Sequence, residues 1–122
     1  MRFARWVFAI AGVWGVLVVT PLYVGFDAIG RRFPPYITHR EFYYGFAAVT
    51  LTWQLVFMVI ASDPARFRPL MPVAALEKFS WVTTLVVLYA TNHVGSSAGL
   101  VGAADLLLGA LFVLAYFMTP AS

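Results

Sequence analysis

The fold is decided by residues 41–63, which read Glu41-Phe-Tyr-Tyr-Gly-Phe-Ala-Ala-Val-Thr-Leu-Thr-Trp-Gln-Leu-Val-Phe-Met-Val-Ile-Ala-Ser-Asp63. No charged residue interrupts this run between Phe42 and Ala61. At ~1.5 Å per residue, about 20 residues of helix cross a hydrocarbon layer ~30 Å thick. The stretch therefore predicts a transmembrane helix over residues 42–61, with Gln54 inside it.

Both ends of this helix carry boundary signals. Thr38 is predicted to cap the first turn, with Glu41 three residues later reaching back to it in a capping box. Asp63-Pro64 is predicted to end the helix, because proline lacks an amide hydrogen and restricts the residue before it.

Composition places the whole chain in lipid. Hydrophobic residues make up 62% of the 122 residues and charged residues only 11%, and the mean hydropathy is +0.86. That charged share is about half the usual share in a soluble domain. The absence of cysteine excludes thiol nucleophiles, iron–sulfur clusters and cysteine-ligated zinc. The net charge of +3 is spread over chain ends and loops, which indicates contact with lipid headgroups and not nucleic-acid binding.

Three further apolar runs predict helices at residues 6–24, 73–91 and 98–118. The first run is too long for the apolar region of a secretory signal peptide, so we expect it to remain as a span. Gly25, Gly30 and Pro34-Pro35 predict that residues 25–37 form a loop without helix. Short connections favour antiparallel neighbours. The prediction is a single all-α domain, an integral membrane four-helix bundle running up-down-up-down.

Basic residues predict the orientation. Five of them fall on the side of the amino terminus and three on the other: Arg2, Arg5, Arg66, Arg68 and Lys78 against Arg31, Arg32 and Arg40. The excess favours both termini in the cytoplasm. Lys78, in the first turns of its span, is expected to extend its ammonium to the headgroups.

Asp105 is the most informative polar residue. It lies eight positions after Ser97, hence ~12 Å inside its span. An acid at a helix centre costs roughly 2.5–3.5 kcal/mol, so Asp105 is predicted to face the bundle and to have a partner. One interpretation is a protonatable or ligand-binding site. The other is a structural hydrogen bond to a Tyr, Thr or Trp of a neighbouring helix. Gly102 and Gly109 lie on the same helix face and predict close packing there.

Other polar side chains are predicted to line the bundle interior. The second span carries an inward stripe that includes Tyr43 and Gln54, and the third carries one that runs from Glu77 through Trp81 and Thr84. A hydrogen bond between Gln54 and Glu77 is one hypothesis, and simple packing is the other. Glu77 is either a first-turn carboxylate favoured by the helix dipole or the wall of a polar cavity. The candidate ligand-binding residues are Tyr43, Gln54, Glu77, Trp81, Thr84 and Asp105.

Metal and cofactor chemistry is not predicted. His39, Glu41 and His93 gather at one side of the bundle, but a surface hydrogen-bond cluster explains them better than a metal site does. The sequence holds no phosphate-binding glycine loop, no His-Glu-x-x-His and no Gly-x-Ser-x-Gly. No residue is assigned as catalytic.

Several segments resemble a family of small bacterial four-span proteins without an assigned activity. They are Pro34–Phe46, Trp53-Gln54, Asp63–Arg66, Arg68–Met71, Glu77-Lys78 and Asp105–Gly109. In topology alone the chain is similar to DoxX-like proteins and to the EXPERA fold of sterol isomerases and sigma receptors. The likeness in topology implies a lipophilic ligand held by intramembrane carboxylates, here Asp105 and Glu77. The resemblance to the bacterial four-span family implies a bacterial inner membrane. Small multidrug transporters have four spans too, but the first span here lacks their glutamate.

Three hypotheses for function follow. The first is a non-enzymatic membrane module that binds a lipophilic molecule or a membrane partner through its polar interior. The second is a membrane enzyme of isomerase type, with Glu77 or Asp105 as acid and base, although helical rise separates the two by ~12 Å in depth. The third is a small transporter that works as a homodimer, with Asp105 as the coupling acid.

Overall fold

The computed structural model describes residues 2–32, 38–93, 95 and 98–120, and in this part of the chain all regular structure is helical. In chain order the elements are α1 (Arg2–Val19), the 3-10 turn η1 (Thr20–Tyr23), α2 (Phe26–Arg32), α3 (Arg40–Ser62), the 3-10 turn η2 (Arg68–Leu70), α4 (Met71–Ala90) and α5 (Ala98–Met118). The all-α prediction is confirmed, and the four long helices begin and end within a few residues of the predicted spans.

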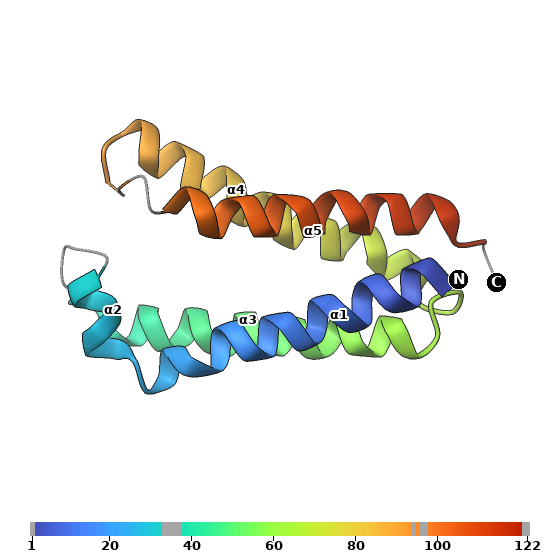
Figure 1. Cartoon of the computed structure of the whole chain (residues 1–122), viewed down its shortest axis with the longest axis horizontal. Coiled ribbons are helices and arrows are strands. Elements are labelled where there is room, and N and C mark those ends of the chain that lie inside the picture. Colours follow the sequence, from blue (N-terminus) through green and yellow to red (C-terminus); the bar gives the residue numbers. More distant parts are fainter. Residues whose placement is uncertain (1, 33–37, 94, 96–97, 121–122) are drawn as a thin grey trace.

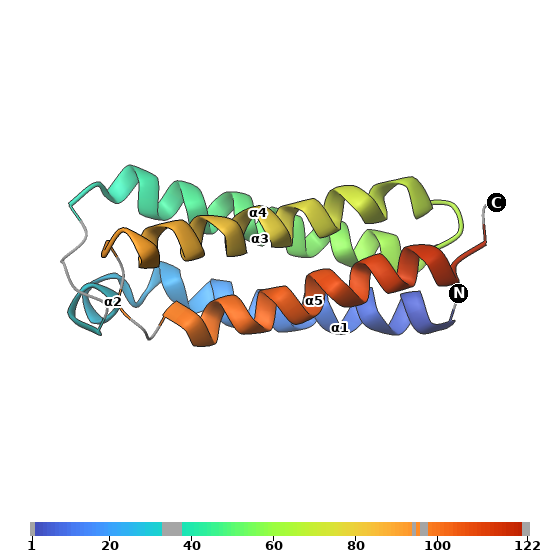
Figure 2. The same cartoon turned by 90° about the horizontal axis from the view of Figure 1, so that it is seen from above.

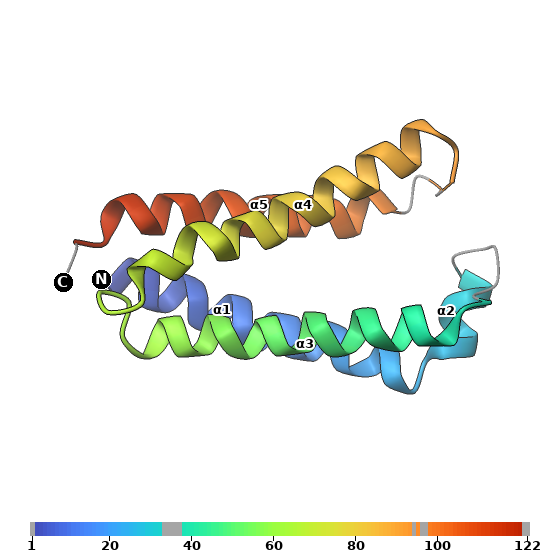
Figure 3. The ribbon, with the colours of Figure 1, turned by 180° about the vertical axis from the view of Figure 1, so that it is seen from behind.

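The four long helices form two antiparallel pairs, α1 with α3 and α4 with α5 (Figure 1). Seen from above, α4 lies over α3 and α5 over α1 (Figure 2). The pairs approach most closely where α1 begins and α5 ends, and they diverge toward α2 (Figure 3). Contact between the pairs is mainly α1 with α5, whereas the consecutive helices α3 and α4 touch only sparsely.

Three fully buried phenylalanines join three of these helices. Phe8 of α1 stacks on Phe112 of α5 with ring centroids 4.3 Å apart, and Phe57 of α3 lies 4.9 Å from Phe112. Small buried residues surround the rings and let the helices approach: Ala4, Ala11, Ala74 and Ala115. Stacked and edge-to-face aromatic pairs at these distances add to the free energy gained from apolar burial.

Glycines shape the contact between α1 and α3. A Cβ atom at Gly12 would come within 2.9 Å of the Gln54 carbonyl oxygen, and one at Gly15 would overlap the Gln54 side chain. Both glycines are therefore required for the observed approach of the two helices.

Two local predictions are wrong. Residues 26–32 form α2, with Gly30 buried inside it, where a loop was expected. Glycine only weakens a helix by about 1 kcal/mol and does not forbid it, and the prolines taken as breakers lie beyond its end. The capping box is also absent: α3 has His39 at its N-cap without a side-chain cap, and Glu41 contacts the His39 ring instead.

Helix α4 ends in a hydrogen-bonding pattern that the sequence alone does not show. Asn92 adopts a left-handed backbone with φ of 62°, and the His93 amide donates to the Leu88 carbonyl. The Asn92 amide donates to the Tyr89 carbonyl, which completes a Schellman motif. Asparagine is, after glycine, the residue that adopts this conformation most readily.

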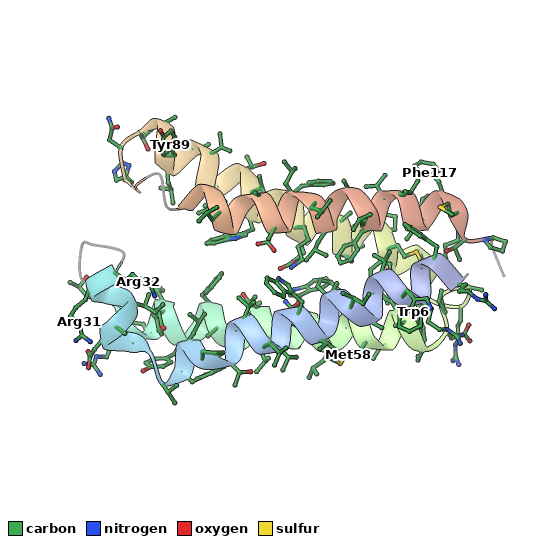
Figure 4. All side chains as sticks on the ribbon, viewed as in Figure 1. Trp6, Arg31, Arg32, Met58, Tyr89 and Phe117 are labelled. Carbon is green, nitrogen blue, oxygen red and sulfur yellow. The ribbon has the colours of Figure 1, made fainter. Side chains whose placement is uncertain are left out.

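Three segments are long and apolar enough to cross a membrane: Arg2–Tyr23, Arg40–Ser62 and Arg68–Ala90. Helix α5 adds the apolar stretch Gly102–Met118. Large apolar side chains cover the outer surface of the helices, for example Leu17, Val49 and Leu107, each more than half exposed. Charged Arg31 and Arg32 lie at the α2 end of the molecule, and Trp6 and Phe117 lie toward the other end (Figure 4). These are the helix lengths and surface of a membrane protein.

Candidate functional site

The centre of the molecule holds three charged side chains in contact. The Lys78 ammonium lies 3.3 Å from Asp105 Oδ1 of α5 and 3.8 Å from Glu77 Oε2 of α4. The exposed fractions of the side chains are 6% for Lys78, 18% for Asp105 and 19% for Glu77. The prediction that Asp105 faces inward and has a partner is confirmed, but the partner is a lysine and not a Tyr, Thr or Trp.

Lys78 does not extend to the headgroup region, so that prediction is wrong. Its ammonium instead lies 5.2 Å from the centre of the Phe57 ring, over the aromatic core. An ammonium at this distance is attracted by the face of the ring as well as by the two carboxylates. The Lys78 side chain, two turns into α4, is thus held by contacts inside the protein and not at the headgroups.

The cluster has more acceptors than donors. With both carboxylates ionised, one ammonium faces two negative charges, so the net charge of the cluster is −1. Lys78 donates a hydrogen bond to Asp105. Glu77 Oε2 is buried and, among the described residues, has no hydrogen-bond partner. A buried acceptor without a donor is costly, and the cluster is therefore able to take a proton or another donor.

Gln54 supplies a second buried acceptor, on α3. Its side chain is 1% exposed and packs into the notch at Gly15, and its Nε2 donates to the Thr50 carbonyl 2.8 Å away. Gln54 Oε1 has no hydrogen-bond partner in the described part of the chain. The proposed hydrogen bond between Gln54 and Glu77 is thus not formed. The inward stripe of α3 itself is confirmed by the burial of Ala47, Gln54 and Phe57.

The remaining candidate residues do not join the cluster. Trp81 packs on Phe46 of α3, with ring centroids 5.0 Å apart. Thr84 is exposed, and its hydroxyl donates to the Ser80 carbonyl of its own helix. The prediction that the polar stripe of α4 faces the bundle interior is therefore wrong at Thr84. The Tyr43 hydroxyl donates to the Leu22 carbonyl 2.6 Å away, and Tyr43 lies fourteen residues, or ~21 Å of helix, from Phe57.

The close approach of α4 and α5 brings the charged residues together. A Cβ at Gly109 would lie 2.7 Å from the Phe79 ring, and one at Gly102 would lie 3.4 Å from Leu85. The glycines on the Asp105 face thus allow the packing that the sequence predicted. Helical rise alone predicted that Glu77 and Asp105 differ by ~12 Å in depth. That prediction is wrong, because both carboxylates lie close to the same Lys78 nitrogen, at 3.8 Å and 3.3 Å.

The polar residues at the α2 end stay apart from this site. His39 pairs with Glu41 at 3.2 Å, and the His93 ring nitrogen lies 2.8 Å from the Thr91 hydroxyl. Within the described ranges no three His, Asp or Glu side chains gather closely enough to hold a metal ion.

Sequence analysis missed Lys78 as a member of the site. The available signal was a basic residue seven positions inside α4 together with an acid inside α5, because two opposite charges within apolar spans are expected to pair.

Comparisons with protein families, with curated proteins and with solved structures find no match. The chemistry of the site is therefore inferred from its own geometry.

Proposed function

We propose that the four long helices cross a lipid bilayer and that the Lys78–Asp105–Glu77 cluster binds the polar head of a lipophilic molecule. The observation that carries this proposal is the buried Glu77 Oε2, which has no hydrogen-bond partner among the described residues and lies 3.8 Å from the Lys78 ammonium. An intramembrane carboxylate of this kind marks a functional site by default. The head that complements it carries a hydrogen-bond donor, either an amine or a hydroxyl group.

The role of each side chain follows from its contacts. Lys78 and Asp105 hold one another at 3.3 Å and keep the cluster in place. Glu77 is the acceptor that remains for the ligand. Phe57, whose ring lies 5.2 Å from the Lys78 ammonium, supplies an apolar wall for the rest of the ligand. Few convergent polar groups among apolar walls are typical of sites for small lipophilic molecules.

Native mass spectrometry of the protein in mild detergent, combined with lipid analysis, tests this proposal. Wild type is compared with Glu77→Gln and Asp105→Asn. Glu41→Gln is the matched control, because it makes the same change in a side chain that is 69% exposed. A lipophile with an amine or hydroxyl head, retained by wild type and control and lost in Glu77→Gln, is the expected result. An identical set of bound molecules in all four proteins contradicts a ligand site at the cluster.

A second candidate function is acid–base catalysis on a lipophilic substrate. It is favoured by the fact that both carboxylates contact one lysine, since an acid and a base that serve one substrate must reach the same place. Once a bound lipophile is known, its exchange of carbon-bound hydrogen in deuterated water is the test. Exchange that persists in Glu77→Gln and in Asp105→Asn argues against these residues. A homodimeric transporter is the weaker alternative, and a monomer in mild detergent argues against it.

We further propose that both termini lie in the cytoplasm, in a bacterial inner membrane. Because Lys78 is buried in the cluster, it no longer counts as a loop charge. The comparison becomes four basic residues, Arg2, Arg5, Arg66 and Arg68, against the three at the α2 end. Labelling of single cysteines at position 66 and at position 31 in intact cells tests the orientation, and the cysteine-free chain makes each label specific.

A further inference from the structure

Lys78 is the single lysine of the sequence, and the other seven basic residues are arginines. An arginine fork would match two carboxylates well and stays protonated, whereas a lysine nitrogen becomes a nucleophile once it loses a proton. This lysine occurs inside the protein between two carboxylates, with its nitrogen 3.3 Å from Asp105 and 3.8 Å from Glu77. Its position indicates a chemical use of the nitrogen beyond pairing with the carboxylates.

The two carboxylates differ in what they can do for that nitrogen. Asp105 Oδ1 accepts a hydrogen bond from Lys78 and so orients it. Glu77 Oε2 is buried and has no hydrogen-bond partner among the described residues, which leaves it available to accept a proton from the ammonium. The 3.8 Å between them is longer than a hydrogen bond, and such contacts commonly tighten when a substrate binds. A nucleophile with a base beside it is the arrangement that covalent catalysis requires.

The surroundings favour the neutral amine. Transfer of a proton from the ammonium to Glu77 replaces two opposite charges by two neutral groups, and a site with little water favours this exchange more than bulk water does. The Lys78 side chain is only 6% exposed, and its nitrogen lies 5.2 Å from the centre of the buried Phe57 ring. The amine is therefore formed in apolar surroundings.

We propose that Lys78 forms an imine with the aldehyde or ketone group of a lipophilic molecule. The ammonium gives one proton to Glu77, and the amine attacks the carbonyl carbon, which forms the new C–N bond. A second proton moves from the nitrogen to the carbonyl oxygen. The C–O bond of this adduct then breaks, and the oxygen leaves as water with the proton returned by Glu77. Nothing is oxidised or reduced, and the protonated imine keeps the positive charge of the lysine beside Asp105.

The inference goes beyond the binding proposed above, because it assigns a carbonyl head and a covalent bond. The side chains of Glu77 and Asp105 are 19% and 18% exposed, so the cluster is reached past the carboxylates although Lys78 itself is buried. The molecule is lipophilic because the cluster lies within two apolar helices, beside the aromatic core.

Reductive trapping in the full-length protein in mild detergent tests the proposal. Decanal is the probe, sodium cyanoborohydride reduces the imine to a stable secondary amine, and mass spectrometry locates each decyl group. The amino terminus is the other amine of the chain and serves as the internal reference. Glu77→Gln removes the proton acceptor, and Lys78→Arg removes the nucleophile but keeps its charge. Glu41→Gln is the matched control for Glu77→Gln, because the Glu41 side chain is 69% exposed.

We expect a decyl group on Lys78 in folded wild type and in Glu41→Gln, and in Lys78→Arg a label at the amino terminus alone. Positioned acid–base groups contribute about 10²–10⁴-fold, so Glu77→Gln should slow labelling of Lys78 by about 100-fold or more and leave the amino terminus unchanged. Labelling of wild-type Lys78 only after unfolding in sodium dodecyl sulfate overturns the proposal. A Lys78 rate in Glu77→Gln equal to or above that of wild type also overturns it. Absence of the adduct while lipophiles are still retained through Glu77 overturns the imine alone and leaves reversible binding in place.

Discussion

The Lys78 ammonium lies 3.3 Å from the Asp105 carboxylate, although 27 positions separate the two residues in the chain. The contact joins α4 to α5, as does the close approach of the Phe79 ring to Gly109, where an added Cβ would lie 2.7 Å from the ring. It also leaves Glu77 as the carboxylate without a hydrogen bond. The pairing thus separates a structural carboxylate, Asp105, from one that is free to bind.

Removal of the lysine is expected to destabilise the protein more than removal of either carboxylate. Lys78→Met leaves two partly buried carboxylates without a cation. Loss of one partner from a fully buried ion pair costs about 3–5 kcal/mol, and the remaining exposure of the two carboxylates places the expected loss toward or below the lower end of that range. Glu77→Gln keeps the Lys78–Asp105 pair and is expected to have little effect. Unfolding in mixed detergent micelles measures these free energies. The triple variant Lys78→Met, Glu77→Gln, Asp105→Asn is expected to recover part of the loss, and a Lys78→Met protein as stable as wild type contradicts the role given to the pair.

The all-helical fold and the helix bounds were predictable because length and hydropathy act locally. Residues 98–118 were predicted as one helix, and α5 has these bounds. Contacts between helices were harder to predict. The hypothesis of a Gln54–Glu77 hydrogen bond assumed that the second and third spans, α3 and α4, pack side by side, whereas these two helices touch only sparsely and α3 packs on α1. Asp105 was recognised by its depth alone, but its partner depends on a neighbouring helix, which no pattern within one helix identifies.

Gly15 is expected to be sensitive to the smallest substitution. In Gly15→Ala the new methyl group overlaps the buried Gln54 amide, and overpacking of this kind costs typically about 1–3 kcal/mol. Gly45→Ala is the control, since it meets no atom within 4 Å and is expected to be neutral or to stabilise the helix by up to about 1 kcal/mol. Thermal unfolding in detergent measures both.

A double variant identifies the cause of the Gly15 effect. If the overlap with Gln54 is responsible, Gly15→Ala with Gln54→Ala loses less free energy than the sum of the two single changes, because the methyl group then occupies the space of the amide. Strict additivity of the two losses would show that overlap with the Gln54 side chain does not cause the loss of stability in Gly15→Ala.

Gly109 makes the corresponding contact between α4 and α5. A Cβ there would lie 2.7 Å from the Phe79 ring, so Gly109→Ala is expected to push the helices apart and to weaken the Lys78–Asp105 contact one turn away. Unfolding free energy should fall by about 1–3 kcal/mol. Phe79→Leu removes the ring atoms that clash, and the double variant is therefore expected to be closer to Phe79→Leu alone than to Gly109→Ala. Equal stability of Gly109→Ala and wild type would mean that α4 and α5 pack more loosely than the 2.7 Å approach of a Gly109 Cβ to the Phe79 ring indicates.

Arg68 is expected to hold the end of α5 in place from the loop before α4. Its Nε donates to the carbonyls of Tyr116 at 3.2 Å and Thr119 at 2.7 Å, and its guanidinium lies 3.9 Å from the centre of the Tyr116 ring. The last carbonyls of a helix have no partner within it, and a cation also interacts favourably with the negative end of the helix dipole. Arg68→Gln removes the positive charge, and its shorter side chain does not reach both carbonyls. Amide hydrogen exchange in the last turn of α5 should accelerate, while exchange in the middle of α5 stays unchanged. Arg66→Gln is the matched control, because Arg66 is exposed and, among the described residues, its guanidinium contacts the adjacent Phe67 ring and has no role at the end of α5. Equal acceleration in both variants would show that the loop as a whole, and not the Arg68 hydrogen bonds, holds the end of α5.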